Sequence, residues 1–302
     1  MIVDCYTHTW ETPEQLGRCL PPDGGTSAGA SQCLDPRLTG VNRHLASAKP
    51  ADATFVLGFK SQYLDAEIPN ERVASYVSQH PECLIGFAGV DPSRPSEAIA
   101  ELRRAHDELG MKGVAVAPAA QDFHPSNSQA MLVYAEAADL QLPVLFHTGV
   151  CLSSAIKLEY ARPVLLDEVA RELPGLKMII AHLGCPWVDE TLLLLAKHEN
   201  VYAEISWLPD QPWHAYQALL GANQLGVTDK LLFGSGFPQT TVSHCIEELY
   251  ELAHLVQGTT LPNIPRERLR GIVERDALSL LGITMPVSRA AIPATSSPGG
   301  DY

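Results

Sequence analysis

The chain has 302 residues, of which 46% are apolar and 19% are charged, and its mean hydropathy is zero. This composition is typical of a globular protein with a large core and excludes disorder as the main state. With 21 Lys and Arg against 35 Asp and Glu, the formal charge is −14, which argues against nucleic acid and membrane partners. We see no signal peptide in the first ten residues and no C-x-x-C pair among the seven cysteines. We therefore expect reduced thiols in a cytoplasmic protein.

Short β-type runs alternate with helical stretches along the chain, and several of the runs are apolar on both faces, as buried parallel strands are. We predict eight strands, at Ile2–Tyr6, Thr54–Phe59, Leu84–Val90, Gly113–Ala117, Pro143–Phe146, Lys177–Ala181, Val201–Ile205 and Lys230–Phe233. Apolar periodicity predicts helices at Asn70–His80, Pro95–Leu109, Ser128–Leu140, Pro163–Leu173, Val188–His198, Trp213–Leu225 and Thr241–Val256, with a final helix at Pro265–Leu281.

Eight strands, each followed by a helix, predict an α/β fold of the (β/α)8 TIM-barrel class. A doubly wound sheet is the alternative, but the chain has neither G-x-G-x-x-G nor G-x-x-x-x-G-K. We expect the barrel to span residues 1–284, with Glu11–Pro36 as a long loop over its mouth. Residues 285–302, rich in Ser, Pro, Ala and Gly, predict a disordered tail.

Three histidines stand where predicted strands end: His8, His147 and His182. Because the C-terminal ends of barrel strands meet at one mouth, we expect the three rings to converge, as they do in catalytic zinc sites with an open position. Period-two alternation would place Asp4, Tyr6 and His8 on one face of the first strand.

The alternative for any single histidine is a hydrogen-bonded core residue without a ligand. The other eight are expected on helix or loop surfaces in nearly every case: His44, His80, His106, His124, His198, His214, His244 and His254.

At this point the sequence resembles a known family. The run Ile2-Val3-Asp4-x-x-x-His8, the turns His147-Thr148-Gly149 and His182-Leu183-Gly184, and the segment Leu232–Pro238 resemble the amidohydrolase superfamily, in its aminocarboxymuconate-semialdehyde decarboxylase-like, amidohydrolase 2 branch. The resemblance spans about residues 1–283, with support from Val90-Asp91-Pro92, Gly110–Val114 and Asp276–Gly282, and it implies a barrel of the metal-dependent hydrolase type.

The chain departs from the family pattern at three positions. Tyr6 stands where members usually carry the first histidine of Asp-x-His-x-His. Gly236 stands where strand 8 usually supplies an aspartate, and Ala115 replaces a lysine that is common on strand 4.

The resemblance implies that His8 and His147 hold a divalent metal, with zinc the first candidate, while His182 orients or deprotonates the attacking water. The departures predict that metal binding is weakened or absent. Restoring the pattern with Tyr6→His and Gly236→Asp is expected to raise metal uptake by orders of magnitude.

Weaker candidates for the metal are Tyr6 as a phenolate, the thiols of Cys151 and Cys185, and the carboxylate of Glu204. A buried thiol that only packs is the alternative for each cysteine, and a hydrogen bond to a histidine is the alternative for Glu204.

Candidate substrate contacts are Lys60 and Arg18, which could bind a carboxylate, and Trp10 and Trp187, which could form an apolar wall. Surface charge and ordinary packing are the alternatives.

The predicted function is an amidohydrolase-related hydrolase, or a lyase such as a decarboxylase, that acts on a small carboxylated or cyclic carbon compound. One alternative is a catalytically inactive barrel that binds a metabolite or a protein partner. The resemblance also extends to lactonases that work without a cation, which makes a metal-free lactonase the third hypothesis. The sequence does not decide whether the protein forms a homo-oligomer.

Overall fold

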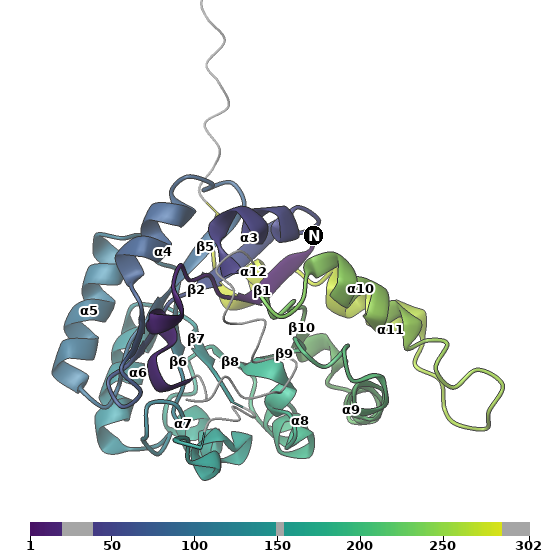
Figure 1. Ribbon diagram of the computed structural model, residues 1–302. Helices are drawn as coiled ribbons and strands as arrows, with labels where there is room; N and C mark the ends of the chain where they lie inside the picture. Colours follow the sequence, from purple (N-terminus) through teal and green to yellow (C-terminus); the bar gives the residue numbers. More distant parts are fainter. Residues whose placement is uncertain (20–38, 149–153, 286–302) are drawn as a thin grey trace, which may run out of the picture.

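The computed structural model describes residues 1–19, 39–148 and 154–285 (Figure 1). Its main sheet has eight strands, and each bonds in parallel to the next in chain order. They are β1 (Val3–Thr7), β2 (Ala53–Leu57), β5 (Leu84–Gly89), β6 (Gly113–Val116), β7 (Val144–Phe146), β8 (Met178–Ile180), β9 (Val201–Glu204) and β10 (Leu231–Leu232). All eight predicted strands are confirmed, with ends that differ by at most two residues.

Backbone hydrogen bonds join the first strand to the segment of the last one, and so close the sheet into a barrel. The amide of Cys5 donates to the carbonyl of Phe233 at 2.9 Å, and the amide of His8 donates to that of Phe237 at 3.0 Å. The amide of Gly236 donates to the carbonyl of Tyr6 at 3.0 Å. The predicted TIM barrel is therefore confirmed.

The helices surround the strands, as Figure 1 shows. They are α3 (Val41–Ala48), α4 (Asn70–Val77), α5 (Pro95–Asp107), α6 (Ser128–Asp139), α7 (Asp167–Glu172), α8 (Val188–Lys197), α9 (Pro212–Gln224), α10 (Val242–Glu251), α11 (Arg266–Val273) and α12 (Ala277–Leu281). Short 3-10 helices lie at η1 (Pro13–Cys19), η2 (Leu158–Ala161), η3 (Pro163–Leu166), η4 (Ala181–Gly184) and η5 (Thr228–Lys230). None of the helices in the described ranges is long and apolar enough to cross a bilayer.

Both faces of the strands are apolar because both are covered. Phe55, Phe87 and Leu145 belong to the cluster inside the barrel. Phe146, the residue after Leu145 on β7, and Ile180 on β8 belong to the larger cluster between the sheet and the helices. Uninterrupted apolar strands are the expected result of this two-sided burial.

The structure differs from the sequence prediction in four places. The single helix predicted at Pro265–Leu281 is divided into α11 and α12, because the carboxylate of Asp276 accepts from the amide of Ser279 and starts a new helix there. The sequence analysis missed α3 and a hairpin of two three-residue strands, β3 (Phe59–Ser61) and β4 (Ala66–Ile68). Of the predicted loop Glu11–Pro36, Pro13–Cys19 is helical, while residues 20–38 and the predicted tail from 286 onward lie outside the described residues.

Strand β1 does not alternate strictly. Its pairing with β2 is irregular between Asp4 and Thr7. As a result Cys5 and Tyr6, which are sequence neighbours, both belong to the cluster inside the barrel. Of the three residues expected on one face, Tyr6 contacts His8 and His147, whereas the carboxylate of Asp4 bonds to Ser235.

Candidate active site

The end of β1 places a tyrosine hydroxyl between two histidines. The hydroxyl of Tyr6 lies 2.6 Å from Nδ1 of His147 and 3.3 Å from Nε2 of His8. Nδ1 of His8 faces the carbonyl of Leu57 at 3.0 Å and so carries a proton, which leaves Nε2 as an acceptor.

The three histidines that were predicted at strand ends come together. His147 follows β7, and His182 follows β8 with its backbone in the left-handed region at φ 54°. The ring centroids of His147 and His182 are 5.0 Å apart, and that of Tyr6 lies 4.5 Å from His182 and 5.2 Å from His8.

A buried carboxylate orients His182 through a serine. The hydroxyl of Ser206 donates to Glu204 Oε1 at 3.0 Å and lies 2.7 Å from Nδ1 of His182. Because the Ser206 hydroxyl donates its only proton to Glu204, it must accept from His182, and Nδ1 of His182 is therefore protonated. The amides of His182 and Ser206 also donate to the two oxygens of Glu204, at 2.6 and 2.7 Å. The tautomer that results leaves Nε2 of His182 as a lone-pair acceptor.

Trp207 covers His182. The two rings are stacked, with centroids 4.1 Å apart and planes 2° from parallel. The backbone of Trp207 is at φ 65°, an unusual conformation for a bulky side chain. Nε2 of His182 and Nε1 of Trp207 are both buried, and neither has a hydrogen-bond partner among the described residues.

The indole of Trp207 lies beside Gly236, the position after β10 where family members usually carry an aspartate. Gly236 has φ 76°, and a Cβ on it would lie 2.7 Å from Cδ1 and 2.8 Å from Nε1 of Trp207. An aspartate there would therefore require the indole to move. This crowding argues against the expectation that Tyr6→His with Gly236→Asp raises metal uptake.

Burial sets the protonation of the cluster. It lowers the pKa of His8 to about 3 and that of His147 to about 4, and it holds the pKa of His182 well below its usual range, with added repulsion from His147 and His8. Burial also raises the pKa of Glu204 to about 7. All three imidazoles are therefore neutral at pH 7.

Asp4 ties β1 to the end of β10. Its carboxylate accepts from the amide of Ser235 at 2.8 Å and from the hydroxyl of the same residue at 2.6 Å. The side chain is fully buried, and burial raises its pKa to about 6. This contact serves the closure of the barrel.

Of the weaker metal candidates, Tyr6 and Glu204 belong to the cluster, whereas Cys185 lies beside His214 and Cys151 is outside the described residues. The thiol of Cys185 is 3.6 Å from Nδ1 of His214, and burial raises the pKa of the thiol. Ala115 is in the barrel interior. Within residues 1–19, 39–148 and 154–285, no three His, Cys, Asp or Glu side chains gather as a metal site would require.

The candidate substrate contacts are dispersed. Trp10 is buried in the cluster around α4, and Trp187 packs at the edge of another cluster at the start of α8. Arg18 donates to the carbonyl of Tyr63 and lies over its ring, 5.2 Å from the centroid.

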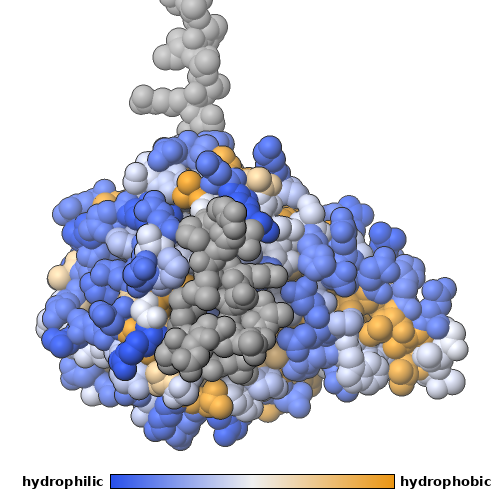
Figure 2. All heavy atoms as spheres, viewed as in Figure 1, coloured by the Kyte–Doolittle hydropathy of each residue, from blue (hydrophilic) through white to orange (hydrophobic). Residues whose placement is uncertain are grey.

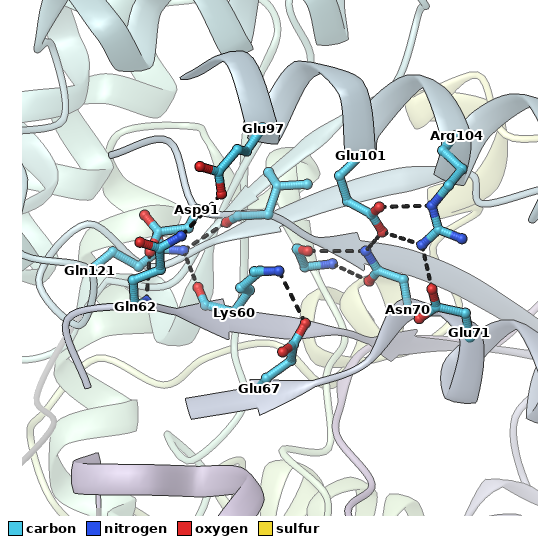
Figure 3. A network of polar contacts seen from close by, with 12 residues as sticks. Lys60, Gln62, Glu67, Asn70, Glu71, Asp91, Glu97, Glu101, Arg104 and Gln121 are labelled. Carbon is cyan, nitrogen blue, oxygen red and sulfur yellow. Dashed lines mark hydrogen bonds and ion pairs between the residues drawn. The ribbon is translucent and has the colours of Figure 1, made fainter. Parts of the chain in front are cut away.

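Lys60 belongs to a separate polar network on the β3–β4 hairpin and α5 (Figure 3). Its ammonium pairs with Glu67 at 3.2 Å. Asn70 donates to Glu101 at 2.6 Å, and Gln62 donates to Asp91 at 2.8 Å. The pocket beside Lys60 is lined by residues of this network and by none of the three site histidines.

Glu204 is predicted from the sequence as a metal candidate or as a hydrogen-bond partner of a histidine, and its Oε1 accepts from the amide of His182. Sequence reasoning did not place Ser206 and Trp207 beside His182. The relevant signal was their place at the end of β9, where a barrel strand opens into the mouth.

One comparison with known proteins identifies the family of the chain. A sequence model described as Amidohydrolase, of the amidohydrolase 2 type, matches residues 3–283. No curated protein matches the chain.

Solved structures share the fold at low sequence identity. An uncharacterized TIM-barrel protein from Bordetella bronchiseptica is 22% identical with a TM-score of 0.70, over 93% of this chain and 98% of that one. A dihydroxybenzoic acid decarboxylase from Polaromonas sp. JS666, with bound manganese and 2-nitroresorcinol, is 18% identical with a TM-score of 0.64, over 93% and 96%. A probable 2-pyrone-4,6-dicarboxylic acid hydrolase from Acinetobacter baumannii, with citric acid bound, is 16% identical with a TM-score of 0.62, over 93% and 99%.

Proposed function

Since this chain belongs to the amidohydrolase family, we propose that it is a hydrolase of a small carboxylated or cyclic carbon compound that works without a metal ion. The observation that carries the proposal is the chain of contacts from Glu204 through Ser206 to His182. It leaves Nε2 of His182, which lies among aromatic side chains, as a base without a hydrogen-bond partner in the described part of the chain. The resemblance to a probable 2-pyrone-4,6-dicarboxylic acid hydrolase favours a lactone as the substrate class.

The residues present do not fit a divalent cation. A zinc ion needs ligand nitrogens at about 2.0–2.1 Å and three protein ligands in a catalytic site. Here the hydroxyl of Tyr6 already contacts the nitrogens of His8 and His147. The indole of Trp207 lies where an aspartate at position 236 would project. Two neutral histidines without a carboxylate leave the charge of a cation uncompensated.

The chemistry assigned to His182 is general base catalysis. Nε2 removes a proton from water as the water oxygen bonds to the carbonyl carbon of the substrate, and the same nitrogen then returns the proton to the departing oxygen. The imidazolium that forms in between lies 3.3 Å, from Nδ1 to Oε1, from the carboxylate of Glu204. Burial of this pair strengthens their attraction.

A pH dependence follows from Glu204. Because burial raises the pKa of Glu204 to about 7, its side chain becomes fully ionised only as the pH rises past 7. Only the ionised form stabilises the imidazolium. We expect kcat/KM to increase from pH 6 to pH 8 and Glu204→Gln to lower it and flatten the profile.

The test is an assay of 2-pyrone-4,6-dicarboxylate and simple lactones in the presence of a chelator, alongside 2,6-dihydroxybenzoate with and without manganese. We expect chelator-resistant hydrolysis that His182→Gln lowers at least about a hundredfold. His106→Gln is the matched control, because His106 is an α5 histidine that bonds only to its neighbour Asp107 at 2.8 Å.

Two outcomes contradict the proposal. Turnover that appears only with manganese would support the metal-dependent alternative. Binding without turnover of any of these compounds would support the inactive barrel, which the departures at Tyr6 and Gly236 favour.

A further inference from the structure

Two buried polar atoms of the site lack a protein partner, and they have opposite character. Nε1 of Trp207 can only donate a hydrogen bond. Nε2 of His182 can only accept one, because Nδ1 carries the proton toward Ser206. Among the described residues both atoms are buried without a hydrogen bond. A buried polar atom without a partner costs about 1–3 kcal/mol, so a group that bonded to both atoms would be stabilised here.

The two atoms belong to rings that are in direct contact. The ring planes of His182 and Trp207 are 2° from parallel, and their centroids are 4.1 Å apart. Tyr6, 4.5 Å from His182 between centroids, and His147, 6.4 Å from Trp207, stand around the same stack.

Only some groups match this pair. A carboxylate would accept from Trp207 but would meet the lone pair of His182. An ammonium or a metal cation would suit His182 but would meet the N–H of Trp207. A hydroxyl satisfies both with a single oxygen, since it accepts one hydrogen bond and donates another.

We propose that Trp207 and His182 together hold one hydroxyl group, whose oxygen accepts from Nε1–H of Trp207 and whose proton is donated to Nε2 of His182. Two sources share this chemistry, a bound water molecule and a hydroxyl on the ligand. A water in this place is the nucleophile of the proposed hydrolysis, already bonded to its base. A ligand hydroxyl instead defines the substrate class as a hydroxylated ring.

Trp207 is thus a positioning residue, and the inference rests on the proposed function through the role of His182 as base. The N–H of the indole stands where relatives place a carboxylate, so the group opposite His182 is changed from an acceptor to a donor. That reversal accounts for how the site can orient a hydroxyl without a cation.

The test is NMR spectroscopy of the full chain labelled with ¹⁵N in tryptophan and histidine. Trp207→Phe keeps the stacked ring, removes the N–H, and identifies the indole signal among four tryptophans. For a bound water we expect a nuclear Overhauser effect from the Trp207 indole proton to water, and a His182 Nε2 shift typical of a hydrogen-bonded acceptor. For a ligand hydroxyl we expect both signals to move on titration with 2,6-dihydroxybenzoate but not with 2,6-dimethoxybenzoate.

Binding and turnover give independent readouts. We expect Trp207→Phe to weaken 2,6-dihydroxybenzoate about tenfold if the ligand supplies the hydroxyl, or to lower kcat about tenfold with little change in KM if water does. Trp213→Phe is the control, because Trp213 is 54% exposed on α9 and stacks on Tyr216.

The proposal is overturned if the Trp207 indole contacts neither water in the free protein nor any of these compounds at saturating concentration. It is also overturned if His182 carries its proton on Nε2. The NMR signals report the hydroxyl site whether or not the protein turns over a substrate, so this failure is distinct from failure of the proposed function.

Discussion

Gly236 is the residue where the family pattern and the structure conflict most directly. Its φ of 76° is in the region that favours glycine, and the space beside it belongs to Trp207. The double substitution Tyr6→His with Gly236→Asp is therefore expected to disturb the stacked pair before it creates a metal site.

Substitution by alanine separates crowding from backbone strain at this position. Gly226→Ala is the matched control, because Gly226 has φ 71° and nothing within 4 Å of an added Cβ. We expect Gly226→Ala to cost about 1 kcal/mol in free energy of unfolding from strain alone, and Gly236→Ala to cost about 2 kcal/mol more from overpacking. Chemical denaturation measures both, and equal losses would show that Trp207 yields without cost.

The sequence predicts the frame of this site better than its contents. His8, His147 and His182 could be found because each follows an apolar strand, and strand ends meet in a barrel. The contact of Tyr6 with His147 could not be found, because it joins β1 to the turn after β7, and alternation within one strand does not specify a contact with another strand. The partner of Glu204 and the position of Trp207 depend on backbone angles after β9, which no local pattern encodes.

Helix α3 was not predicted from the sequence, and its residue His44 was expected on the surface. Both errors have the same cause. His44 is buried and joins three elements. Its Nε2 lies 2.8 Å from the hydroxyl of Thr7 on β1, and its Nδ1 lies 2.9 Å from that of Tyr76 on α4. The segment Val41–Ala48 reads as polar because its buried face includes this histidine rather than an apolar residue.

We expect His44→Ala to lower the free energy of unfolding by about 3 kcal/mol, through lost hydrogen bonds and a cavity. Burial lowers the pKa of His44 to about 3, so its contribution is present above pH 6.5 and is lost as the pH falls toward 3. The difference in stability between native and variant should therefore shrink from pH 7 to pH 5. His254→Ala, at an exposed histidine, is the control, and a difference that does not change with pH would contradict the burial argument.

For the molecule as a whole, closure of the barrel makes stability depend on Asp4. Burial raises the pKa of this carboxyl from 3.8 to about 6, so the folded protein holds the proton more tightly than the unfolded chain does. The stabilising contribution is complete below pH 3.8 and is lost as the pH rises through 6. Asparagine has the same shape and stays neutral, and it can still accept from the amide of Ser235.

We expect Asp4→Asn to gain stability relative to the native protein between pH 4 and pH 7, by about 3 kcal/mol. Urea denaturation across this range measures the difference. Asp139→Asn, at an exposed carboxyl on α6, should give a curve parallel to that of the native protein. A parallel curve for Asp4→Asn as well would mean that Asp4 is ionised throughout.

The segment between α10 and α11 projects away from the barrel (Figure 1), and apolar atoms are exposed on that side of an otherwise mostly hydrophilic face (Figure 2). Residues 257–263 are all exposed, and Leu255 and Leu261 are 41% and 45% exposed. Residues 252–265 contain no lysine or arginine, so trypsin has no site here, whereas a protease of broad specificity such as subtilisin finds seven accessible residues in a row.

Subtilisin is therefore expected to nick the chain once in this segment. The short C-terminal fragment should nonetheless stay bound in gel filtration, because Leu269 and Ile272 of α11 and Leu278 of α12 are buried in the core. Release of the fragment would show that these helices are held by chain connectivity rather than by packing. A nicked but intact barrel would make this projection a natural place to open or extend the chain without reaching the mouth.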